Sequence, residues 1–185
     1  MADQGAEGRL SPFLRRQRFK AALPYIRGSV LDIGCGTGDL AQYFDSENYY
    51  GYDIDKDSIE IARKKFPNHC FNSTLPSKNK RFLTVVSLAV IEHVPSSFDF
   101  LFELRDYLCD DPYARIVCTT PHPSFEWFHD LGAFFGLFSK HANEEHEELL
   151  DRKKLYEAGK KSKLYIIEYN RFLYYANQLV VYKKI

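Results

Sequence analysis

The stretch Val30-Leu31-Asp32-Ile33-Gly34-Cys35-Gly36-Thr37-Gly38-Asp39 carries the most structural information in the sequence. Its first four residues predict a short apolar strand that runs directly into a turn with glycines at alternate positions, and a helix is expected to begin near Asp39. Glycine allows positive φ and lets a ligand lie against bare main chain. The start of the following helix offers unpaired N–H groups to a polar or anionic group. The stretch therefore predicts a site for a nucleotide-like cofactor.

Two further stretches follow in order. Tyr49-Tyr50-Gly51-Tyr52-Asp53 predicts a second strand that ends in a carboxylate, and Val85-Val86-Ser87-Leu88-Ala89-Val90-Ile91-Glu92-His93-Val94 predicts a fourth strand followed by a Glu-His pair. Strands that alternate with helical patterns are typical of a parallel sheet covered on both faces. Asp53 then falls at the carboxyl end of a strand, where open α/β sheets bind ligands.

The pattern Gly34-x-Gly36-x-Gly38, preceded by Asp32, resembles motif I of the class I S-adenosylmethionine-dependent methyltransferases. The three stretches together resemble the small-molecule branch of that class, which includes ubiquinone-pathway O-methyltransferases, over roughly residues 25 to 120. The resemblance implies a three-layer, Rossmann-like α/β fold with a seven-stranded, mostly parallel sheet. The implied strand order is 3-2-1-4-5-7-6, with the last strand antiparallel. The implied cofactor is S-adenosylmethionine.

The resemblance also implies which residues bind the cofactor. An acid at the position of Asp53 accepts hydrogen bonds from both ribose hydroxyls in this family. Asp32 is expected to orient the loop and to meet the amino group of the methionine moiety. Arg15 or Arg16, on a leading helix, is a candidate for the carboxylate, although a solvated surface arginine is the alternative. The remaining expected cofactor residues are Gly34, Cys35, Gly36, Gly38, Ile54, Asn72, Ser73, Leu88 and Ala89.

The adenine and methionine contacts follow from the same comparison. The family usually places an Asp after the third strand to accept a hydrogen bond from the adenine amino group. This sequence offers Asn72 and Ser73 instead, whose side-chain oxygens can accept the same bond. Ile54 is expected to pack against the adenine face, and Leu88 or Ala89 to lie beside the methionine moiety.

His93 and His146 are the candidates for a general base, which would assist departure of a hydroxyl proton during methyl transfer. A structural role for His93 is an open alternative. In the ubiquinone-pathway enzymes a Glu three residues before the Glu-His pair helps to bind a divalent cation, and here that position is Ala89. One carboxylate and one imidazole make an incomplete site, so no metal is predicted.

Composition limits the number of domains and the kinds of partner. The 185 residues fit a single domain, residues 1–185, comprising a cofactor-binding core (10–120), an aromatic-rich cap insert and helix (121–160) and a closing pair of strands (161–185). Because the formal net charge is zero and no Asn/Asp-Pro-Pro-Tyr motif follows the fourth strand, no nucleic-acid partner is expected. No signal peptide or membrane span is apparent, which predicts a cytoplasmic location. The oligomeric state is left open.

Three local expectations complete the description. Helical periodicity predicts a leading helix over 12–26 and another over Glu144 to Ala158, ended by Gly159. The aromatic residues 121–143 are expected to cover an acceptor pocket, with a satellite hydrophobic cluster or a membrane-adsorbing patch as alternatives. The four cysteines lack metal-ligand spacing and are expected to be buried thiols.

The sequence thus predicts an enzyme that transfers a methyl group from S-adenosylmethionine to a small, partly apolar or aromatic acceptor, with O-methylation favoured. Three alternatives remain: a turn that binds a nicotinamide dinucleotide, a methyltransferase for a protein or lipid-linked substrate, and a non-catalytic subunit that supports a partner enzyme.

Overall fold

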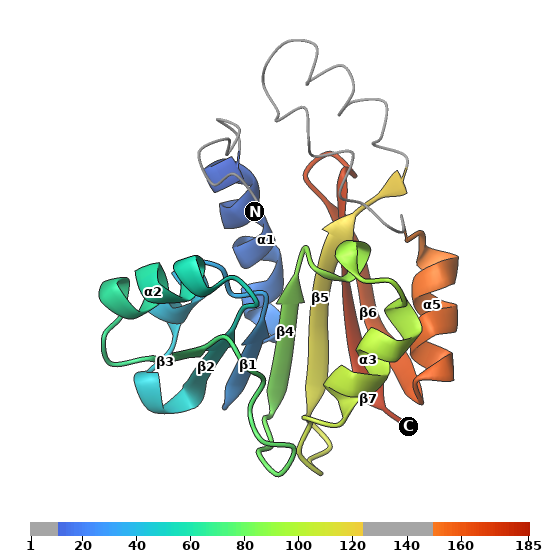
Figure 1. The fold of residues 1–185 in the computed structure, drawn as a ribbon. Coiled ribbons are helices and arrows are strands. Elements are labelled where there is room, and N and C mark those ends of the chain that lie inside the picture. The colour runs from blue at the N-terminus through green and yellow to red at the C-terminus, as the bar shows by residue number, and fades with distance from the viewer. Residues whose placement is uncertain (1–10, 124–149) are drawn as a thin grey trace.

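The computed structural model describes residues 11–123 and 150–185, which form one sheet with helices around it (Figure 1). The strands are β1 (Val30–Ile33), β2 (Tyr49–Tyr52), β3 (Cys70–Asn72), β4 (Thr84–Leu88), β5 (Arg115–Pro121), β6 (Leu164–Phe172) and β7 (Asn177–Lys184). The α-helices are α1 (Ser11–Ala22), α2 (Lys56–Lys65), α3 (Ser97–Arg105) and α5 (Arg152–Lys161). Short 3-10 helices cover Leu23–Tyr25, Asp39–Tyr43, Ser46–Asn48 and Ile91–His93.

The strand order is β3-β2-β1-β4-β5-β7-β6, which confirms the predicted topology. Every neighbouring pair is parallel except the two pairs that β7 makes, which are antiparallel. The last strand is therefore inserted between β5 and β6 and runs against both.

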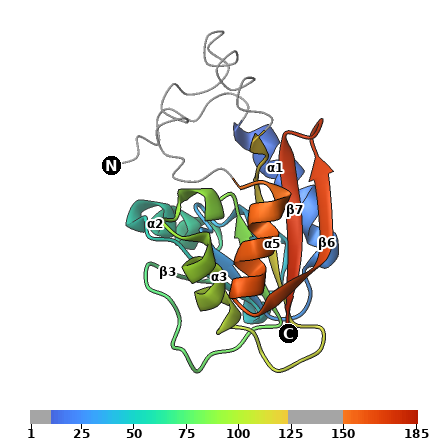
Figure 2. The same cartoon turned by 90° about the vertical axis from the view of Figure 1, so that its right-hand side faces the viewer.

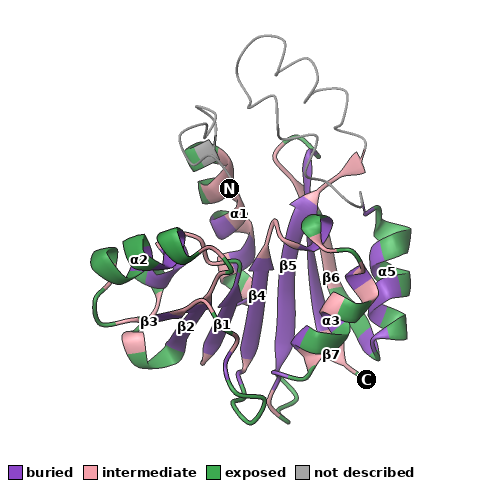
Figure 3. Ribbon diagram, in the orientation of Figure 1, coloured by how far each residue is buried: buried purple, intermediate pink, exposed green. Residues whose placement is uncertain are grey.

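Helices cover both faces of the sheet, and alternate residues of the central strands enter two separate cores. One core joins Val86 and Val117 to side chains of α1 and α2. The other joins Val85 and Ile116 to side chains of α3 and α5, which lie side by side (Figure 2). The central strands are buried along most of their length (Figure 3). This three-layer arrangement confirms the predicted fold class.

The strand order reverses between β1 and β4, because the chain builds outward from β1 to β3 before it returns to β4. Open α/β sheets bind ligands at such a reversal, outside the carboxyl ends of the strands. The parallel register pairs Ile33 with Tyr52. Gly34 and Asp53 consequently leave the sheet at the same level, which brings the glycine turn and the carboxylate together.

Some boundaries differ from the expected ones. The leading α-helix ends at Ala22 and does not continue to residue 26, because Pro24 lies in the 3-10 turn Leu23–Tyr25 that follows. The expected helix after the glycine turn is a single 3-10 segment, Asp39–Tyr43. Of the four cysteines expected to be buried, Cys118 is buried, and Cys35 and Cys109 are only half-buried. The expectation for Cys70 was wrong, because β3 is an edge strand and leaves that residue exposed.

Helix α5 corrects the prediction of a helix that stops at Gly159. Residues 144–149 lie outside the described residues, and the helix begins after Asp151, whose carboxylate accepts a hydrogen bond from the Lys154 amide at 2.8 Å. Gly159 lies inside the helix, and the left-handed residue that follows its end is Lys163, with φ of 57°. The glycine is there for packing, since a Cβ would lie 2.6 Å from Cε1 of Tyr182.

Gly159→Ala should therefore lower the free energy of unfolding by about 1–3 kcal/mol, the usual cost of overfilling a packed core. The Tyr182 ring cannot move away freely, because its hydroxyl donates to the Leu155 carbonyl oxygen at 2.9 Å. Helix propensity alone predicts the opposite sign, a gain of up to about 1 kcal/mol. Urea denaturation decides between them, with exposed Lys160→Ala as the control that should change little.

Two other expectations concern parts of the chain that are only partly described. Of the aromatic segment 121–143, the structure describes Pro121 to Pro123, and the rest lies outside the described residues. Within 11–123 and 150–185, no helix has the length and apolar character needed to cross a bilayer.

Candidate functional site

The turn after β1 is held in shape by the backbone of β2. The amides of Gly34 and Cys35 both donate to the Tyr52 carbonyl oxygen, at 2.8 and 3.0 Å. Gly38 has a φ of 77°, and a Cβ there would lie 2.7 Å from the Phe71 ring, so only glycine fits. A Cβ at Gly36 would meet nothing within 4 Å. The main chain at Gly36 therefore faces open space, as a surface that cradles a ligand must.

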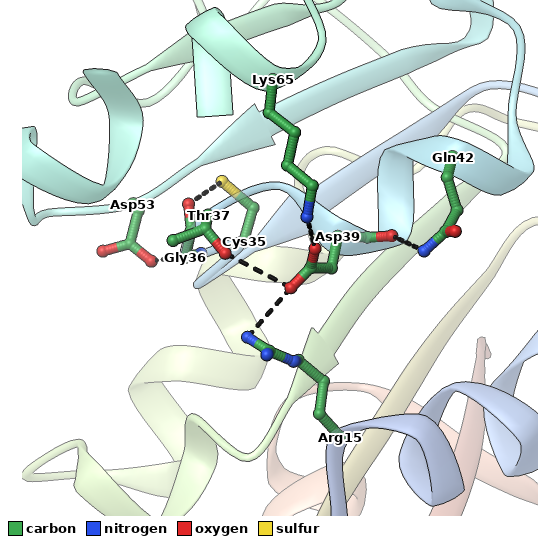
Figure 4. Close-up of polar contacts among 8 residues, drawn as sticks. All are labelled: Arg15, Cys35, Gly36, Thr37, Asp39, Gln42, Asp53 and Lys65. Carbon is green, nitrogen blue, oxygen red and sulfur yellow. Dashed lines mark hydrogen bonds and ion pairs between the residues drawn. The ribbon is translucent and has the colours of Figure 1, made fainter. Parts of the chain in front are cut away.

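Asp53 is held by two main-chain donors, one of which, the Gly36 amide of this turn, is drawn in Figure 4. Its Oδ2 accepts from the Gly36 amide at 2.7 Å, and its Oδ1 accepts from the Asp55 amide at 2.9 Å. Each carboxylate oxygen has a second lone pair, so both can still accept a hydroxyl hydrogen bond. The carboxylate is thus preorganised to bind two neighbouring hydroxyl groups. Ile54, the next residue, is 82% exposed, as a residue that packs on a ligand face would be before the ligand arrives.

Asp32 is buried at the end of β1 and accepts a hydrogen bond from the Tyr49 hydroxyl. Burial raises the pKa of Asp32 to about 7, the Tyr49 hydrogen bond opposes this shift, and the Asp53 charge adds to it. The carboxyl group consequently changes charge near neutral pH. A cation placed beside it would favour the ionised form.

A cavity of about 190 Å³ opens between α1 and the glycine turn. It is lined by Arg15, Arg18, Phe19, Asp32, Gly34, Cys35, Gly36, Thr37, Asp39, Leu40 and Leu88. Five predicted cofactor residues meet here: Asp32, Gly34, Cys35, Gly36 and Leu88. Figure 4 shows Asp39 on the side of the turn away from Asp53. Asp39 pairs with Arg15 at 2.9 Å and with Lys65, and accepts from the Thr37 hydroxyl at 3.3 Å.

Arg18 is the site residue that the sequence analysis missed. It lines the cavity, and its Nε donates to the Asn177 side-chain oxygen on β7 at 3.3 Å. Burial lowers the pKa of Arg18, and the Glu92 charge opposes the shift. Glu92 is 1% exposed, burial raises its pKa, and its Oε2 has no hydrogen-bond partner among the described residues. A half-buried cation that lines the cavity thus interacts electrostatically with a buried carboxylate.

A sequence signal for Arg18 existed. Arg15, Arg18 and Ala22 are spaced by three and four residues, so they share one helix face with the buried Phe19. Arg16 lies outside that face and is exposed, so it is not a candidate for the site.

The remaining predicted residues are not among those that line this cavity, and one of them lies outside the described residues. Asn72 ends β3, and its side-chain oxygen accepts from Arg63 at 3.3 Å, while Ser73 is half-buried. Ala89 follows β4 and has a φ of 59°. Its amide donates to the Thr119 carbonyl oxygen on β5 at 2.8 Å. His93 is exposed in the 3-10 helix after β4. His146 lies outside the described residues.

No group of three or more potential metal ligands is found among the described residues, and the Glu92-His93 pair has Ala89 at the third position. The absence of a metal stays a prediction.

The strand order, the glycine turn at the sheet reversal and the clamped carboxylate define a class I S-adenosylmethionine-dependent methyltransferase. A family model described as "Methyltransferase domain" matches residues 6–169, and the chain belongs to this family. The chain is thus a methyltransferase domain, and its cofactor is S-adenosylmethionine. The residues present fit this cofactor, because the open main chain at Gly36 leaves room for it and both Asp53 oxygens keep a free lone pair.

A curated relative is the "Ubiquinone biosynthesis O-methyltransferase" of Roseobacter denitrificans, 31% identical over 101 residues. The match covers 49% of this chain and 40% of that protein, so the chain spans less than half the length of this relative.

Solved structures share the fold. Magnesium protoporphyrin IX methyltransferase from Synechocystis PCC 6803, with bound S-adenosylhomocysteine, superposes with a TM-score of 0.67 at 17% identity, covering 96% of this chain and 88% of that one. A Thermotoga maritima protein described as a possible histamine N-methyltransferase gives a TM-score of 0.71 at 14% identity, covering 94% and 90%. At these identities the likeness shows the fold alone.

Proposed function

We propose that this enzyme methylates a small, partly apolar or aromatic acceptor, with oxygen as the favoured methyl-accepting atom. The observation that carries the proposal is the cofactor site itself, in which a clamped carboxylate and an open cavity flank the same glycine turn. The aromatic composition of residues 121–143 and the O-methyltransferase activity in the printed name of the Roseobacter relative support the choice of acceptor. We also propose one domain, residues 1–185, divided at 120 and 160, and a cytoplasmic location.

S-adenosylmethionine supplies a methyl group activated by its sulfonium sulfur, so the protein has mainly to orient the two reactants. Asp53 accepts hydrogen bonds from the ribose hydroxyls, a charge-assisted contact with two acceptor atoms. Gly34, Gly36 and Gly38 shape the floor beneath the ribose and the methionine moiety. These roles use the turn as the structure presents it.

The two ends of the cofactor need different partners. At the methionine end, Asp32 receives the amino group and Arg18 attracts the carboxylate. Leu88 and Ala89 lie beside the rest of the methionine moiety. We choose Arg18 over Arg15, because Arg15 is already paired with Asp39. At the other end, Ile54 packs on the adenine face, and Asn72 or Ser73 accepts from the adenine amino group.

His93 is our candidate general base among the described residues. It stands at the carboxyl end of β4, the edge of the sheet that carries the cofactor site, and it is exposed to an incoming acceptor. A neutral imidazole there accepts the hydroxyl proton as the methyl group arrives. His146 remains a second candidate.

The test is methyl transfer from S-adenosylmethionine with a labelled methyl group to a panel of catechols, phenols, indoles and carboxylic acids. We expect label in an organic-extractable ether that survives mild base, which separates it from a methyl ester. Asp53→Ala should reduce the signal and serves as the matched control. Label found only in precipitated protein or in phospholipid of a cell extract would instead favour a protein or lipid-linked acceptor.

A further inference from the structure

A second cavity, of about 510 Å³, lies at the edge of the sheet opposite the cofactor site. Its walls come from four places: the loop before β4, the end of α3 and the loop after it, the α5–β6 turn, and the end of β7. In Figure 1 the end of β7, marked C, lies at the lower edge, while the arrows of β4 and β5 point to the upper edge. The lining residues are Lys78, Arg81, Arg105, Asp106, Asp110, Lys163, Lys184 and Ile185.

The lining carries five cationic and two acidic side chains. Three cations have an acidic partner: Lys78 pairs with Glu103 at 2.9 Å, Arg105 with Asp106 at 3.2 Å, and Lys184 with Asp110 at 3.3 Å. Within residues 11–123 and 150–185, Arg81 and Lys163 have no carboxylate within ion-pair distance. Two cationic side chains of this cavity therefore have no ion-pair partner in the part of the chain that the structure describes.

Main-chain carbonyl groups hold these cations in place without neutralising them. Arg81 Nη1 donates to the carbonyl oxygens of Lys78 and Lys80, Arg105 Nη1 to that of Ser162 at 3.3 Å, and Lys184 Nζ to that of Leu108 at 2.9 Å. Arg81 keeps further N–H donors beyond those on Nη1. The donors are thus partly ordered before a ligand arrives, which lowers the entropy cost of binding.

Lys163 is held at this cavity by its backbone. It has a left-handed φ of 57°, a conformation that glycine or asparagine usually supplies after a helix. Its amide donates to the Lys160 carbonyl oxygen and its carbonyl oxygen accepts from the Ile185 amide, both at 3.1 Å. These bonds tie the α5–β6 turn to the end of β7 and fix where the Lys163 side chain leaves the main chain.

We propose that this cavity binds a soluble ligand that carries two or more linked phosphate groups. A ligand with adjacent negative charges satisfies Arg81 and Lys163 together, and guanidinium groups suit phosphate oxygens. The cavity has the size of a small-molecule site, and Ile185 is its one apolar lining residue, which favours a phosphate chain over an apolar ring. The site is separate from the cofactor site and does not depend on the proposed acceptor.

Calorimetric titration of the full chain with inorganic triphosphate at 150 mM NaCl, roughly physiological ionic strength, tests the proposal. We expect one binding site, with Arg81→Ala and Lys163→Ala each weakening affinity by about tenfold, the scale of a charge-assisted hydrogen bond. The matched control is Lys153→Ala, an exposed lysine of α5 outside the cavity, which should bind as the parent does. Unchanged binding of S-adenosylhomocysteine by all three variants shows that they fold.

Three results would overturn the proposal: no triphosphate binding, equal binding by all variants, or binding only of larger polyanions. The last is tested with a single-stranded oligonucleotide of about 20 nucleotides, which exceeds the site size of a typical single-strand-binding fold. It is tested also with vesicles that contain a phosphorylated inositol lipid. If the protein binds the oligonucleotide or the vesicles and inorganic triphosphate does not displace them, this cavity is part of a surface for nucleic acid or for a membrane.

Discussion

Asp53→Ala should weaken the binding of S-adenosylhomocysteine by about 10- to 100-fold, or roughly 1.5–3 kcal/mol, the scale of hydrogen bonds to a charged group. The carboxylate does two things at once, because it also accepts the Gly36 amide at 2.7 Å. Its loss therefore removes the proposed ribose contacts and frees the turn that forms the floor of the site. Isothermal titration calorimetry measures the change directly.

Two further variants separate these contributions. Asp53→Asn keeps one acceptor oxygen, so we expect an intermediate loss of affinity. Asp55→Ala removes the carboxylate that caps α2 through the amides of Asp57 and Ser58, while its main-chain amide remains available to residue 53. That variant should lose about 1 kcal/mol of stability and keep its cofactor affinity. Unchanged affinity in Asp53→Ala would remove Asp53 from the cofactor site.

The features that the sequence predicted correctly depend on local pattern. The four residues before Gly34 form a buried parallel strand. Gly34, Gly36 and Gly38 then have positive φ, and the Phe71 ring leaves no room for a Cβ at Gly38. Asp53 could be placed because parallel strands end at the same edge of the sheet. The strand order followed from the family resemblance, whose motifs lie in this part of the chain.

The features that the sequence did not predict depend on contacts between distant segments. Glycine is typical of a helix end, but Gly159 lies inside the helix, where it packs against Tyr182 on β7. The residue with left-handed φ after the helix is Lys163. Arg18 lines the cavity, where its Nε donates to Asn177 on β7 and the charge of Glu92 in η5 (Ile91–His93) acts on it. The helix face indicates Arg15 and Arg18 together, and no local pattern tells which of the two will interact with a buried carboxylate.

Asp32 should make stability depend on pH in the direction opposite to that of most carboxylates. Its folded pKa, about 7, exceeds its ordinary value of 3.8, so the folded state holds the proton more tightly than the unfolded state does. The stability that this proton contributes is present at low pH and is lost as pH rises through 7. The loss between pH 5 and 8 is about 3 kcal/mol. Asp32→Asn keeps an acceptor for Tyr49 without the titration, so its stability advantage over the parent should grow by that amount in urea denaturation.

The same proton should control cofactor affinity. The amino group of S-adenosylhomocysteine is a cation at neutral pH, and beside Asp32 it favours the ionised carboxylate, so binding below pH 7 requires a proton to leave. We therefore expect affinity to fall about tenfold from pH 8 to pH 6 in the parent and to stay nearly flat in Asp32→Asn. Calorimetry in two buffers of different ionisation enthalpy should also detect one proton released per ligand near pH 6. If the stability of the parent follows the expected pH dependence but its affinity does not, Asp32 is a buried structural acid and the amino group binds elsewhere.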